Sequence, residues 1–121
     1  MPHIILRGPV SVEDVFLAFE PQSFTEKGNR FKAEDAFISR DKTALLIRSI
    51  TIERGFTKTF YVRIGQREDG IHVGLDLLNP PEKSEGVKRL LGLYAWRIMQ
   101  TNPEISVGAT NLTDYLNEPA E

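Results

Sequence analysis

Three charged residues in the middle of the chain could together bind an anion. Residues 31–78 alternate between apolar and other residues, as β-strands do, and Asp35, Arg48 and Lys58 fall within this stretch on its apolar side. Charges on a buried face are costly unless they are paired. Two interpretations are open. Asp35 and Arg48 form a structural ion pair while Lys58 extends to solvent, or Arg48 and Lys58 bind an anionic small molecule in a pocket between the sheet and the second helix, with Asp35 orienting Arg48.

The register that brings these charges together follows from the turns. The links between strands are short, which predicts an antiparallel meander. We expect strands near 31–39, 43–53, 56–66 and 70–78, with turns at 40–42, 53–55 and 67–70. The first turn places Asp35 opposite Arg48, a three-residue second turn places Arg48 opposite Phe60, and the last turn pairs Ile64 with Val73. A slip of one residue would move all three charges to the solvent face.

The opposite face of the predicted sheet carries an apolar patch. Ile38, Leu45, Ile47 and Tyr61 would be neighbours there. A patch of this kind usually contacts another subunit or a partner, so we predict a homodimer that forms through the sheet. Trp96 lies nearly opposite the apolar stripe of the second helix and is a further interface candidate.

Charge is unevenly distributed along the chain. Residues 27–67 contain 10 Lys and Arg against 4 Asp and Glu, or 10 − 4 = +6, whereas the whole chain has a net charge of −2. A sheet that presents Lys32, Arg63 and Tyr61 could bind nucleic acid. Because Glu34 shares that face and the chain as a whole is acidic, we expect a solvated surface there and no nucleic-acid partner.

The elements that position these residues fit into one domain. A chain of 121 residues has room for one core. His3–Arg7 reads as a buried strand, and a first helix follows it, with Ser11 as the N-cap and Pro21 as the end. We expect a loop at 22–29 before the meander begins.

A second helix completes the predicted fold. It begins near Asn79 or Ser84, ends near Asn102 and carries a broad apolar stripe. Residues 104–121 form a C-terminal appendage, and the pattern there allows an extra strand followed by a helical turn. The order strand, helix, four strands, helix predicts a two-layer α+β sandwich with both helices on one sheet face. This element order resembles the TATA-binding-protein-like and helix-grip (Bet v 1-like) folds, and a fold alone does not imply a function.

The N-terminus offers an enzymatic alternative. Met-Pro-His-Ile-Ile-Leu-Arg-Gly resembles the start of tautomerase-superfamily chains over these eight residues. The resemblance implies that Met1 is removed, that the amine of Pro2 moves a proton on a keto–enol substrate, and that Arg7 contacts a substrate carboxylate.

Composition narrows the remaining possibilities. The chain has no cysteine, which excludes disulfides, thiolate metal sites and cysteine nucleophiles. His3 and His72 have no partner set that would define a metal site, so we predict neither metal nor cofactor. The apolar run near residue 1 is shorter than a signal peptide needs, so we expect no targeting segment, and no stretch approaches the roughly 20 apolar residues of a membrane span. We therefore expect a cytoplasmic, non-enzymatic binding or interaction domain that does not contact membranes.

Overall fold

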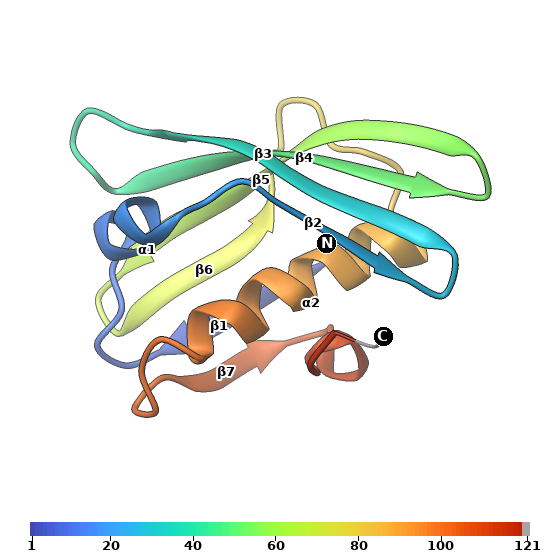
Figure 1. The fold of residues 1–121 in the computed structure, drawn as a ribbon. Helices are drawn as coiled ribbons and strands as arrows, with labels where there is room; N and C mark the ends of the chain where they lie inside the picture. Colours follow the sequence, from blue (N-terminus) through green and yellow to red (C-terminus); the bar gives the residue numbers. More distant parts are fainter. Residues whose placement is uncertain (120–121) are drawn as a thin grey trace.

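The computed structural model describes residues 1–119 and is an α+β structure built on a seven-stranded antiparallel sheet (Figure 1). The elements are β1 (His3–Arg7), α1 (Val12–Ala18), β2 (Gln22–Glu26), β3 (Asn29–Ile38), β4 (Ala44–Glu53), β5 (Phe56–Arg67), β6 (Gly70–Leu75), α2 (Glu85–Met99), β7 (Ser106–Thr110) and a 3-10 turn at Thr113–Tyr115. The strand order is β2-β3-β4-β5-β6-β1-β7. The sheet curls around α2, and both helices cover its inner face, which confirms the predicted two-layer α+β sandwich.

Serine side chains cap both helices at their N-termini. Ser11 accepts a hydrogen bond from the backbone N–H of Asp14 at 3.1 Å, as its position predicts. Ser84 caps α2 by accepting from the N–H of Val87, which decides between the two starting points left open by the sequence. Glu53, at the end of β4, also accepts from the N–H of Gly86 at 2.8 Å. The start of α2 is therefore fixed to the sheet.

The predicted loop at 22–29 is instead a β-hairpin. Strands β2 and β3 are joined by Lys27 and Gly28, which both have positive φ angles of 51° and 81°. Two consecutive left-handed residues make the type I′ turn that matches the twist of a two-stranded ribbon. A lysine in the first of these positions hides the signal, because Asn, Asp and Gly are the residues that normally mark it.

Two of the three predicted strand registers are confirmed and one is wrong. Asp35 pairs with Arg48, and Ile64 pairs with Val73. Arg48, however, lies opposite Tyr61 and not opposite Phe60. The cause is a two-residue turn, Arg54-Gly55, with φ angles of 51° and 80°, in place of the three-residue turn expected.

This slip exchanges the two faces of β4 relative to the prediction. Leu45, Ile47, Ser49 and Thr51 point inward and are buried. The β3–β4 pairing changes register between Ala33 and Asp35, and this bulge keeps the first part of β3 in phase with the core. The core lies between the inner face and α2, and its fully buried side chains include Ile4, Leu6, Phe31, Leu45, Val62, Ile64, Val73, Leu90 and Leu91.

Candidate functional site

The structure does not bring the three predicted ligand-binding charges together. Asp35 and Arg48 lie on the outer face, where Arg48 forms an ion pair with Glu34 at 3.3 Å. Lys58 pairs with the buried Thr51 and so belongs to the inner side, where its Nζ lies 3.9 Å from Glu53. Arg48 and Lys58 are therefore on opposite faces, because the register between β4 and β5 differs by one residue from the one predicted.

The predicted interface residues are also divided between the faces. Leu45 and Ile47 are in the core at 0% and 3% exposure, and Ile38 packs against that core. Tyr61 is half-buried on the outer face, and Trp96 is half-buried on α2. The apolar side chains that β3 and β4 direct to the outer face are Phe37, Leu46, Ile50 and Ile52. The homodimer stays a prediction, with a different set of candidate contacts.

The residues of the enzymatic alternative lie at opposite ends of β1. Pro2 is buried, and Arg7 is exposed, with its Nε 3.2 Å from Asp69. His3 and His72 stack on the outer face, but residues 1–119 contain no group of three or more potential metal-ligating side chains. Within the same range, no helix is long and apolar enough to cross a membrane.

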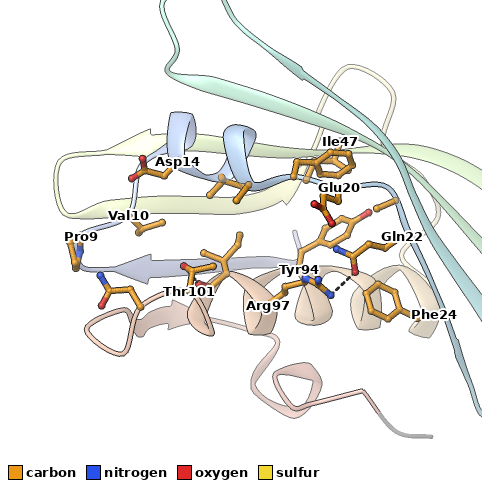
Figure 2. A pocket seen from close by; sticks show the side chains of 16 residues that line it. Pro9, Val10, Asp14, Glu20, Gln22, Phe24, Ile47, Tyr94, Arg97 and Thr101 are labelled. Carbon is orange, nitrogen blue, oxygen red and sulfur yellow. Dashed lines mark hydrogen bonds between the residues drawn. The ribbon is translucent and has the colours of Figure 1, made fainter.

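A cavity of about 380 Å³ lies between α1, the inner face of the sheet and the C-terminal half of α2 (Figure 2). Its walls are mainly apolar and include Val10, Val15, Phe19, Phe24, Ile47 and Ile98. Its polar lining includes Asp14, Glu20, Gln22, Tyr94, Arg97 and Thr101. The cavity is in the layer where the sequence predicted a pocket, but it is built from other residues.

The short link between α1 and β2 directs polar groups into this cavity. Phe19 leaves the helical conformation at the C-cap, with φ −66° and ψ 134°, and Pro21 favours extended backbone at the residue before it, Glu20. Side chains alternate along extended backbone, so Glu20 and Gln22 both reach the cavity. Figure 2 shows Glu20, Gln22, Tyr94 and Arg97 at one end, with Asp14 toward the other.

Tyr94 supplies a neutral hydroxyl to the lining. The Tyr94 hydroxyl oxygen lies 2.8 Å from the Oγ of Ser49, and the Ser49 hydroxyl donates to the carbonyl of Ile47 at 3.0 Å. Since the proton of Ser49 is already used, Tyr94 donates to Ser49 and keeps capacity to accept a hydrogen bond. Burial raises the pKa of the Tyr94 phenol far above its ordinary value, so the group carries no charge at neutral pH.

Arg97 is the cation at the cavity. Its Nη1 donates to the Oε1 of Gln22 at 2.6 Å, and the side chain is otherwise exposed. Among the described residues, no carboxylate lies within ion-pair distance of it, although Glu20 lines the same cavity. The end of the cavity near β2 therefore carries one cation and one carboxylate that do not neutralise each other directly.

Helical spacing could have identified part of this site. Tyr94, Arg97 and Ile98 stand at positions i, i+3 and i+4, which places them on one face of α2, and Thr101 follows two residues after the helix ends. Tyr94 and Ile98 belong to the predicted apolar stripe, but Arg97 at its margin reads as a solvated charge. The opposing wall depends on β2, which the sequence does not predict.

Comparison of the chain with protein-family models, with curated proteins and with solved structures found no significant match. The geometry of the cavity and the chemistry of its lining are therefore the basis on which a function is proposed.

Proposed function

We propose that the protein is a non-enzymatic binding domain that holds a small, largely apolar molecule in the cavity between α1, α2 and the sheet. The observation that carries this proposal is the cavity itself, at about 380 Å³ and with mostly apolar walls. Pockets for small molecules typically measure roughly 300–1,000 Å³ and combine apolar walls with a few polar groups. At about 30 Å³ per water molecule, the cavity has the volume of roughly a dozen waters, and so accommodates a ligand of similar heavy-atom count.

The enzymatic alternative has less support. Pro2 lies at the start of β1, where it lines a second cavity together with Lys83, Lys88 and Asn111. Arg7 is engaged by Asp69 at the other end of β1, so the two groups cannot act on one small substrate within a single chain.

Binding can be tested by NMR with indole as the probe, a neutral apolar molecule smaller than the cavity. Indole should shift amide resonances of residues that line the cavity, in a saturable way. Ala18→Trp should remove this binding, because Ala18 lines the cavity and is accessible enough for a larger side chain to fill the opening. Leu17→Trp is the matched control, since Leu17 is 74% exposed and does not line the cavity. Absent shifts, or shifts centred on the outer face, would contradict the proposal.

We also propose that two copies associate through the outer face, in the cytoplasmic setting expected from the sequence. Support comes from Phe37, which is 49% exposed, and from the half-buried Leu46 that pairs with it on the face that no helix covers. Sedimentation equilibrium should report a dimer that Phe37→Glu dissociates. Phe56→Glu, at an exposed hairpin end, should leave it intact. A monomeric wild-type protein at high concentration would end this proposal.

A further inference from the structure

We infer that the ligand of the cavity is a zwitterion with an apolar body, of the kind represented by an apolar α-amino acid, whose carboxylate binds Arg97 and whose ammonium group binds Glu20. This inference rests on the proposed binding function and adds the charge pattern of the ligand. It starts from the two unneutralised charges that line the cavity near β2 (Figure 2).

Arg97 has hydrogen-bonding capacity to spare. A guanidinium has five N–H donors, and the one hydrogen bond that the Arg97 side chain makes to a described residue is with the neutral amide of Gln22. A carboxylate can accept two parallel hydrogen bonds from such a group, which is the strongest arrangement between these partners. The amide of Gln22 is a weaker partner, so a ligand carboxylate can compete with it.

Glu20 supplies the complementary charge. It precedes Gln22 by two residues in extended backbone, so both side chains reach the same part of the cavity, and no described residue forms an ion pair with Glu20. Asp14 lines the cavity as well, so the three charged side chains sum to −1. A simple anion would meet repulsion from Glu20, and a simple cation would meet repulsion from Arg97. A molecule that carries both charges avoids both penalties.

The rest of the lining fits an apolar body next to these charges. Phe24, Ile47 and Ile98 form walls around the interior, and Tyr94 adds an aromatic ring whose hydroxyl can accept one further hydrogen bond. The volume of about 380 Å³ corresponds to roughly a dozen non-hydrogen atoms, which is the size of an aromatic amino acid. The apolar walls favour an apolar side chain, because polar groups placed against Phe24, Ile47 and Ile98 would lose hydration.

Four probes with the same phenyl body separate the possible charge patterns. They are L-phenylalanine, 3-phenylpropanoate, 2-phenylethylamine and 3-phenylpropan-1-ol, each titrated by calorimetry and NMR near neutral pH. L-Phenylalanine should bind about tenfold more tightly than either singly charged probe, a ratio that corresponds to one charge-assisted hydrogen bond.

Substitutions assign each charge to its partner. Arg97→Gln should weaken L-phenylalanine and 3-phenylpropanoate but not 2-phenylethylamine, whereas Glu20→Gln should weaken L-phenylalanine and 2-phenylethylamine but not 3-phenylpropanoate. Arg54→Gln, in an exposed turn, is the control for a general loss of positive charge. Thermal unfolding should be nearly unchanged in all three variants, because the altered side chains are exposed.

The outcomes distinguish this inference from the proposed function. If the alcohol binds as tightly as L-phenylalanine, or if one singly charged probe binds best, the zwitterion is wrong while the binding cavity stands. If none of the four probes, nor indole, binds in the cavity, then the proposed function itself fails.

Discussion

Two arginines of α2 contact the same edge strand, β2, in contrasting ways. Arg89 donates from Nε and Nη2 to the two carboxylate oxygens of Glu26 at 2.9 and 2.8 Å, and both side chains are nearly buried at 11% and 10% exposure. Arg97, about two turns later, is exposed and donates to the neutral amide of Gln22. The first contact is a closed structural clamp, whereas the second leaves a charge available to a ligand.

The position of the cavity follows from how the two halves of α2 are held to the rest of the molecule. Arg89 additionally donates to the backbone carbonyls of Tyr115, Asn117 and Glu118, so it fixes the segment after β7 against α2. Polar groups that all have partners close the layer at the N-terminal half of α2. The C-terminal half lacks such a clamp, and there the layer stays open.

Loss of the clamp should have the largest effect. Arg89→Met removes the guanidinium from the buried Glu26 and from three carbonyls, and removing one member of a buried ion pair costs about 3–5 kcal/mol. The free energy of unfolding in urea should fall by that amount. Arg97→Met is the matched control and should change it by less than about 0.5 kcal/mol. Equal losses in the two variants would break the distinction between the arginines.

A second prediction concerns the space that the clamp requires. A Cβ at Gly92 would collide with the backbone oxygen of Tyr115, on the segment held by Arg89. Gly→Ala within a helix normally stabilises by up to about 1 kcal/mol. Gly92→Ala should instead destabilise by about 1–3 kcal/mol, because the segment must move. Hydrogen exchange should show faster exchange confined to the C-terminal segment, and a more stable variant would contradict close packing there.

Tyr94 lies between the clamped and open halves, and its pH dependence can be predicted. The folded-state pKa is raised above 10.0 by burial, so the folded protein keeps a proton that the unfolded chain loses. The contribution of Tyr94 is therefore complete below about pH 10 and declines as the pH rises through 10 toward the folded pKa.

Tyr94→Phe tests this contribution. It should lower the free energy of unfolding by about 1 kcal/mol at neutral pH through loss of the bond to Ser49, and should reduce the alkaline decline. Urea unfolding at pH values from 7 to above 10 measures both effects. A parallel decline in the variant and the wild type would assign it to other groups, such as Tyr115, whose pKa is raised chiefly by its hydrogen bond to Glu85.

The sequence predicts the elements of the fold better than it predicts the contacts of Arg89 and Arg97. The helices, the meander and the layer that contains the pocket follow from periodicity and from caps such as Ser11. The exact pairing does not, because Lys27 and Arg54 adopt left-handed conformations in turns that normally favour Asn or Gly. Without β2, neither the Glu26–Arg89 clamp nor the Gln22–Arg97 contact can be anticipated, since each joins residues more than 60 positions apart. The bulge beside Asp35 also cannot be predicted, because the interpretation of the strands assumes that side chains alternate strictly between the two faces.

The smallest expected effect on stability comes from giving Arg97 a carboxylate partner, as Arg89 has in Glu26. Gln22→Glu places a carboxylate where Arg97 now meets an amide, and an exposed ion pair adds about 0–1 kcal/mol to the free energy of unfolding. The same change should weaken binding of L-phenylalanine by about tenfold, because Arg97 becomes occupied and negative charge is added beside Glu20. Gln22→Leu controls for loss of the amide and should preserve binding. If Gln22→Glu binds L-phenylalanine as well as the wild type does, then a free guanidinium at Arg97 is not needed for binding. Arg97 and Arg89 would then differ only in burial.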